Sequence, residues 1–172
     1  MQDSSLRIRW ATAADADPVA ELAAELAQSF PFSRAAFAQA YPAVLAAEDA
    51  CLLLATDSGT GRDPAGDPAG GTGRGGPVGY LLGFQHPAFF ANGPVAWVEE
   101  ILVRPQYRGR GAGRALMTAF EQHAAGQGCR LVALATRRAA PFYRALGYQE
   151  SAAYFRKVLS SGGTGGTGGG GG

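Results

Sequence analysis

The sequence predicts an α/β domain whose strands and helices follow the order β-α-α-β-β-β-α-β-α-β. Three patterns predict it. Residues 6–10 alternate apolar and polar side chains, as in a strand with one buried face. Apolar residues recur at helical spacing from Val19 to Leu26. Short apolar runs at 51–55 and 131–135 are typical of fully buried strands.

The other elements follow from the same patterns. A second helix is expected from about Ser33 to Ala47, interrupted near Pro42 because proline has no backbone N–H. The rest, in chain order, are strands at 78–84 and 96–103, a helix from 113 to about 126, a short helix at 139–146 that Gly147 stops, and one or two closing strands within 148–159.

The length of 172 residues fits one domain, and 47% hydrophobic residues suffice for a core. Two segments stand apart because their composition cannot bury enough apolar surface to offset the entropy of ordering. Residues 57–77 are rich in Gly, Pro and Asp, and residues 160–172 are almost all Gly, Ser and Thr. We therefore expect a single domain at 1–159, with a long flexible loop at 57–77, and a disordered Gly-rich tail at 160–172.

Charge and cysteine content exclude several classes of protein. The net charge of +1 gives no general attraction to nucleic acid or to an acidic membrane. Cys51 and Cys129 lie in apolar runs, which favours buried free thiols in a reducing compartment. His86 and His123 are isolated, so no metal site is expected. Without a signal peptide or a membrane span, we expect a cytoplasmic protein.

The turn at Arg108–Gly113 precedes a helix and carries the strongest chemical signal. A helix N-terminus offers free N–H groups to an anion, and glycine lets the backbone approach it. A P-loop is excluded because the only lysine is Lys157, and a dinucleotide fingerprint is disfavoured because Arg114 replaces its third glycine. A tight strand-to-helix turn that simply needs glycines stays open as the structural alternative.

Two segments together resemble the GNAT superfamily of N-acetyltransferases. Residues 98–116, Val-Glu-Glu-Ile-Leu-Val-Arg-Pro-Gln-Tyr-Arg-Gly-Arg-Gly-Ala-Gly-Arg-Ala-Leu, resemble its acyl-CoA motif, with Arg108, Gly111 and Gly113 at the motif positions. Residues 139–148, Ala-Ala-Pro-Phe-Tyr-Arg-Ala-Leu-Gly-Tyr, match a second family motif. Two motifs in the right order are far more specific than either alone.

The resemblance implies a mixed, mostly antiparallel central sheet of six to seven strands with about four helices, splayed between the fourth and fifth strands. It also implies acetyl-CoA as cofactor. The main chain near the end of the fourth strand would pair with the pantetheine arm, and the loop N–H groups would hold the pyrophosphate. The implied cofactor-binding residues are Leu102, Val103, Arg108, Gly109, Arg110, Gly111, Ala112, Gly113, Arg114 and Thr136; many family members carry Asn where Thr136 stands.

The same resemblance suggests catalytic residues. Tyr143 is the implied general acid for the leaving thiolate, since a phenol can supply a proton. Glu99 and Glu100 are candidate bases for the amine; adjacent strand residues point to opposite faces unless a bulge intervenes. Family alignment favours Glu99. A carboxylate that only attracts a cationic substrate is the alternative.

The implied function is acetyl-CoA-dependent N-acetylation of a primary amine by direct transfer in a ternary complex. A non-catalytic acyl-CoA-binding regulatory module, motivated by Thr136, and a protein N-acetyltransferase are the alternatives. The expected partner is a small-molecule amine, with no nucleic acid and no membrane, and a homodimer stays open. Four aromatic residues are candidates for the amine pocket: Tyr41, Phe89, Phe90 and Trp97.

Overall fold

The computed structural model describes residues 6–26, 30–57 and 76–159. The chain forms two compact units, residues 1–137 and 138–172. The predicted loop at 57–77 lies, from 58 to 75, outside the described residues, as does the predicted tail at 160–172.

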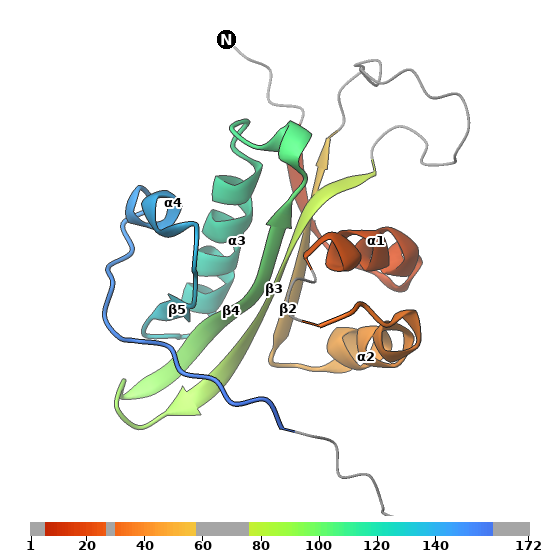
Figure 1. Ribbon diagram of the computed structural model, residues 1–172. Helices are drawn as coiled ribbons and strands as arrows, with labels where there is room; N and C mark the ends of the chain where they lie inside the picture. The colour runs from red at the N-terminus through yellow and green to blue at the C-terminus, as the bar shows by residue number, and fades with distance from the viewer. Residues whose placement is uncertain (1–5, 27–29, 58–75, 160–172) are drawn as a thin grey trace, which may run out of the picture. The chain divides into compact units, whose positions relative to one another are not determined.

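A five-stranded sheet forms the centre of the first unit, with its strands in chain order across the sheet. Neighbouring strands from β1 to β4 are antiparallel, and β5 pairs parallel to β4 (Figure 1). This confirms the predicted mixed, mostly antiparallel sheet. The strands are β1 Leu6–Trp10, β2 Ala50–Asp57, β3 Pro77–Ala88, β4 Gly93–Val103 and β5 Val132–Leu134.

Helices cover both faces of the sheet in this unit. α1 (Ala16–Leu26) and α2 (Arg34–Ala46) lie on one face, and α3 (Ala112–Gly126) lies on the other (Figure 1). The predicted interruption of the second helix was wrong, because α2 continues through Pro42. Pro42 is exposed, so water can satisfy the carbonyl that loses its N–H partner, while the buried Tyr41 helps to anchor the helix.

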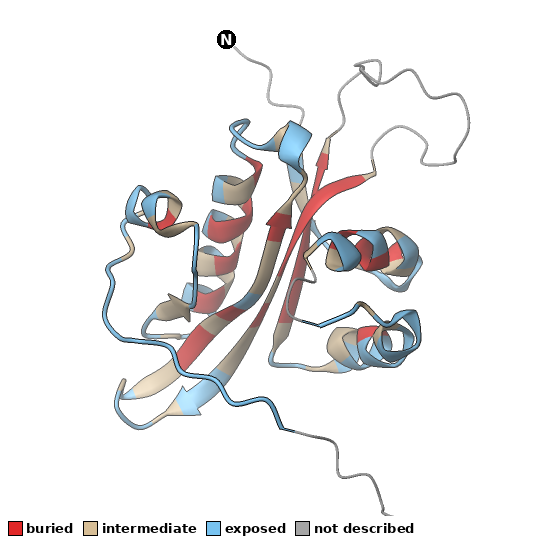
Figure 2. Ribbon diagram, in the orientation of Figure 1, coloured by how far each residue is buried: buried red, intermediate tan, exposed pale blue. Residues whose placement is uncertain are grey.

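The hydrophobic core has a layer on each side of the sheet (Figure 2). Towards α1 and α2, Leu22, Tyr41, Tyr80 and Leu102 belong to one buried cluster. On the other side, α3 buries Leu116, Met117, Phe120 and Ala124. Gly83 of β3 is required for this second layer, because a Cβ there would lie 2.4 Å from the Phe120 ring. The two layers fix which side chains of the central strands face which helices.

A charged cluster joins the end of β1 to the start of α1. The Asp15 carboxylate accepts bonds of 2.6 and 2.8 Å from the Arg9 guanidinium, and bonds of 2.8 Å from the N–H and the hydroxyl of Thr12. Asp15 is buried. The hydrogen bond from Arg9, together with those from Thr12, holds the pKa of Asp15 far below its usual value.

We expect Asp15→Asn to lower the free energy of unfolding by about 1–2 kcal/mol at pH 7, because an amide cannot accept all four bonds. The lowered pKa means that ionised Asp15 stabilises the fold above the carboxyl pKa of the unfolded chain, about 4. That stabilisation is lost as the pH falls further. Urea unfolding at pH 7 and at pH 3 should therefore show a smaller difference between wild type and variant in acid. A difference that grows in acid would contradict the assignment.

The second unit contains α4 (Ala140–Arg144), followed by a turn in which Gly147 has φ of +93°. The predicted closing strands were wrong: residues 148–159 form no strand, and over the described residues the sheet has five strands rather than six to seven. Alternation predicted them, but a strand also needs a neighbour to accept its main-chain hydrogen bonds. The apolar side chains of the pattern are exposed here, namely Tyr154, Phe155, Val158 and Leu159.

Candidate active site

A bulge in β4 separates the two candidate glutamates. Leu82 of β3 pairs with Glu100 and Gly83 pairs with Val98, so Glu99 has no opposite residue. Leu82 packs against the core cluster beneath α1 and α2, whereas Gly83 faces Phe120 of α3. Paired residues share a face of the sheet, so the bulge turns Glu100 to the side of α1 and α2.

Glu100 has a defined partner on that side. The hydroxyl of Tyr80 donates a hydrogen bond of 2.7 Å to Oε2 of Glu100. Tyr80 is only 1% exposed, and burial together with the nearby carboxylate raises its pKa far above its usual value. Tyr80 therefore remains a protonated donor at neutral pH. The side chain of Glu99, by contrast, is exposed.

Beyond the bulge, one edge of β4 is open. β5 pairs only with Ala96, Trp97 and Val98. In the parts of the chain that the structure describes, no other strand continues this pairing along 99–103. The family resemblance predicts a splay between these two strands, the fourth and the fifth. The main chain of Leu102 and Val103 lies in this stretch, where an extended ligand can add as a further strand.

The glycine turn leads from this open edge into α3. A short 3-10 helix, η2 (Pro105–Tyr107), follows β4 and precedes the turn. Gly109 and Gly111 have φ of +75° and +90°, and a Cβ at either position would meet nothing within 4 Å. Gly111 is the N-cap of α3, and the first helical bond runs from Ala115 N–H to its carbonyl. The preceding N–H groups have no partner within the helix and suit an anion.

The arginines around the turn divide into two groups. Arg104 is engaged by α1, with bonds of 3.3 Å to Glu21 and 3.0 Å to Glu25. Arg108 donates from Nε to the carbonyl of Val103 at 2.9 Å, which ties the turn to the end of β4. Arg110 lies over the ring of Tyr107. Exposed cationic side chains at the turn are those of Arg108, Arg110 and Arg114.

In the second unit, Tyr143 is a buried residue of α4. Its ring makes edge contacts with Phe142 and Tyr148, at centroid distances of 5.0 and 5.9 Å. Burial raises the pKa of Tyr143 above its usual value. The phenol is therefore protonated at neutral pH, which is the form that a general acid requires.

Neither cysteine has the character of a nucleophile. Cys51 is buried in β2, and burial raises the pKa of its thiol to about 12. Burial also raises the pKa of Cys129, whose Sγ lies 3.5 Å from Oε1 of Gln85. Reactive cysteines need the thiolate, so both favour chemistry without an acyl-enzyme. Over the described residues, no group of three or more His, Cys, Asp and Glu side chains gathers to hold a metal.

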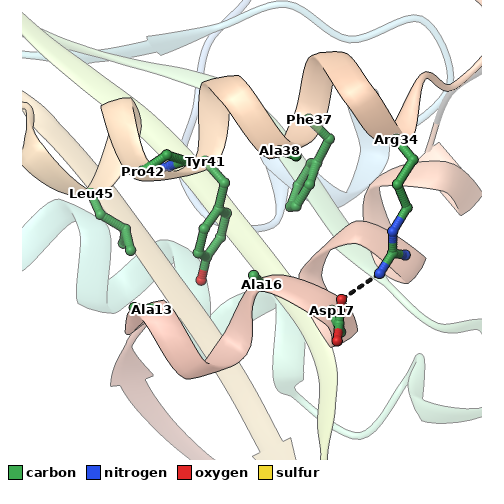
Figure 3. A pocket seen from close by; sticks show the side chains of 9 residues that line it. All are labelled: Ala13, Ala16, Asp17, Arg34, Phe37, Ala38, Tyr41, Pro42 and Leu45. Atoms are coloured by element: carbon green, nitrogen blue, oxygen red, sulfur yellow. Dashed lines mark hydrogen bonds and ion pairs between the residues drawn. The ribbon is translucent and has the colours of Figure 1, made fainter.

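The aromatic residues predicted for an amine pocket lie in different places. Tyr41 lines a cavity of about 280 Å³ between α2 and the start of α1 (Figure 3). Its hydroxyl donates to the Thr12 carbonyl at 2.7 Å. Phe89 and Phe90 are exposed in the turn between β3 and β4, and Trp97 lies on β4. Thr136 follows β5 and is exposed. No helix in the described part is long and apolar enough to cross a membrane.

Comparison with known proteins identifies the family. A family model for GNAT acetyltransferases matches residues 30–148, which is more than half of the chain. The chain belongs to the GNAT acetyltransferase family. A search of curated protein sequences found no significant match.

Solved structures of GNAT acetyltransferases share the fold of the chain. An acetyltransferase from Trypanosoma brucei has 25% identity and a TM-score of 0.68 over 90% of this chain and 99% of its own. The aminoglycoside N-acetyltransferase AAC(6')-Iy in complex with CoA has 20% identity and a TM-score of 0.70 over 92% of this chain and 98% of its own. Glucosamine-6-phosphate N-acetyltransferase from Arabidopsis thaliana has 16% identity and a TM-score of 0.69, over 90% and 99%.

The family resemblance predicts that the glycine turn holds the pyrophosphate of acetyl-CoA. We expect Gly111→Val to raise the Kd for CoA about tenfold, because a β-branched residue at φ of +90° is strained by about 1–3 kcal/mol and shifts the N–H groups of the turn. Isothermal titration calorimetry measures this. Gly128→Val is the matched control, since Gly128 has φ of +78° with the same open space but follows the other end of α3. Equal loss of affinity in both variants would contradict the assignment.

Proposed function

We propose that the chain transfers an acetyl group from acetyl-CoA to a primary amine of a small molecule, directly and within a ternary complex. One observation carries the proposal. The open edge of β4 is followed, after η2, by a glycine turn with positive φ at the start of α3. CoA has an extended pantetheine arm, which can pair with the main chain of a strand, and next to it a pyrophosphate, which needs N–H groups that bind an anion. The exposed arginines at 108, 110 and 114 supply complementary charge.

Different residues of the chain would accept the proton of the amine and donate a proton to the leaving sulfur. Acetyl-CoA supplies the acetyl group as a thioester. An amine arrives as ammonium, and a carboxylate must accept its proton before the nitrogen attacks the thioester carbon. We assign this role to Glu100, whose position is fixed by Tyr80, and keep Glu99 as the competing base. As the carbon–sulfur bond breaks, Tyr143 would donate its phenolic proton to the sulfur.

The structural relatives support a small substrate. An aminoglycoside N-acetyltransferase and a glucosamine-6-phosphate N-acetyltransferase act on small amines by name. The high pKa of both cysteine thiols supports direct transfer over an acyl-enzyme. A soluble amino sugar or an aliphatic amine is therefore the first class of acceptor to test.

The proposal is tested by mixing the full chain with acetyl-CoA and a panel of amino sugars, polyamines, amino acids and peptides, and measuring free thiol. Amine-dependent release of CoA thiol is expected with at least one small amine. Calorimetric binding of CoA with no thiol release from any acceptor or acyl donor would instead indicate a non-catalytic module. Turnover confined to peptides would indicate a protein N-acetyltransferase.

A further inference from the structure

Packing of the core does not require the hydroxyl of Tyr80. Tyr80 belongs to the apolar cluster beneath α1 and α2, where a phenylalanine would fill the same space. Its oxygen instead reaches Oε2 of Glu100 at 2.7 Å. The contact is diagonal, because Tyr80 pairs directly with Leu102 and Glu100 pairs with Leu82. A carboxylate at this place in β4 is thus held by a side chain from the neighbouring strand.

The bulge at Glu99 makes this contact possible. Without the extra residue, Glu100 would share the face of Val98, towards α3. With it, Glu100 shares the face of Tyr80 and Leu102. The bulge therefore places the Glu100 carboxylate beside the buried phenol of Tyr80, just past Val98, where pairing between β4 and β5 ends.

We propose that Tyr80 is a positioning residue for the acetyl transfer, holding the Glu100 carboxylate in one orientation. This inference rests on the proposed function. The hydrogen bond fixes one oxygen of the carboxylate, and a general base must be held in place to accept a proton. The buried phenol suits this role because it stays protonated, and a rigid strand fixes the place of its oxygen.

Other charged groups on this side of the sheet are engaged elsewhere. Arg104 bonds to Glu21 and Glu25, and Arg34 pairs with Asp17 (Figure 3). The hydroxyl of Tyr41 donates to the Thr12 carbonyl.

The test compares Tyr80→Phe with Tyr41→Phe. Both remove a hydroxyl that donates a 2.7 Å bond from the same buried cluster, but only the first bond goes to Glu100. For Tyr80→Phe we expect kcat to fall about tenfold while the KM for acetyl-CoA stays within twofold. In the Glu100→Gln background, Tyr80→Phe should lower kcat no further, because Tyr80 acts through that carboxylate. A further loss in that background, or an unchanged kcat in Tyr80→Phe alone, would overturn the proposal.

A second measurement does not depend on turnover. Carbon-13 NMR of the glutamate carboxyl groups, with the Glu100 signal assigned by its loss in Glu100→Gln, reports the hydrogen bonding of that carboxylate in the free protein. The chemical shift of the Glu100 carboxyl at pH 7 should change in Tyr80→Phe and stay constant in Tyr41→Phe, because only Tyr80 donates to it. An unchanged chemical shift in Tyr80→Phe would overturn the role of Tyr80, whatever the amine panel gives. Absence of turnover in wild type, with the chemical shift changed as expected, would overturn the proposed function alone.

Discussion

Replacing Tyr143 by phenylalanine is expected to lower kcat by about 100-fold while the Kd for CoA stays within twofold. General acids contribute about 10²–10⁴ to rate, and phenylalanine keeps the ring but lacks the proton. The contacts of the ring with Phe142 and Tyr148 should survive, so the variant should fold. Steady-state thiol release and calorimetry together measure the two quantities.

Tyr148→Phe is the matched control for this experiment. It removes the hydroxyl of the aromatic neighbour of Tyr143, so a general loss of local order would affect both variants. Only Tyr143→Phe should lower kcat by two orders of magnitude. An unchanged rate in Tyr143→Phe would remove the residue from the acid role.

The second large effect is expected at the β4 bulge. Glu100→Gln should lower kcat by about 100-fold, because an amide cannot accept the proton of the ammonium. Glu99→Gln should lower it by less than tenfold, because Glu99 is exposed at the bulge and Tyr80 holds the other carboxylate. Measuring kcat/KM for both variants against pH compares two carboxylates that are adjacent in the chain. The reverse order would return the role of base to Glu99, which the family alignment favours.

The parts of the site that depend on neighbouring residues in the chain were predictable. Gly109 and Gly111 predicted the turn, because glycine readily adopts the positive φ that both have. Leu116, Met117 and Phe120 marked the buried face of α3, because helical spacing places them together. The family resemblance, carried by the same segments, was confirmed by the match over residues 30–148.

Features that depend on distant partners were not predictable. The position of the bulge follows from the register of β4 against β3, which a single strand sequence does not contain. Arg104 lies four residues before Arg108 in the chain, but Glu21 and Glu25 of α1 bind it across the fold. The contact from Tyr80 to Glu100 likewise joins two strands, and its only signal was a tyrosine in an apolar run.

The closing segment shows the limit of local patterns in another way. In a strand, Tyr154, Arg156 and Val158 would lie on one face and Phe155 and Lys157 on the other, yet residues 148–159 form no strand. Alternation states which face would be buried, whereas a strand exists only where a partner pairs with its main chain.

The central claim is that the open edge of β4 and the glycine turn together bind acetyl-CoA. A crystal structure of the full chain with CoA tests it most directly. The claim predicts main-chain hydrogen bonds from 99–103 to the pantetheine arm, and the pyrophosphate within hydrogen-bonding distance of N–H groups between Arg108 and Arg114. A pyrophosphate bound away from this turn, with residues 99–103 uncontacted, would contradict it.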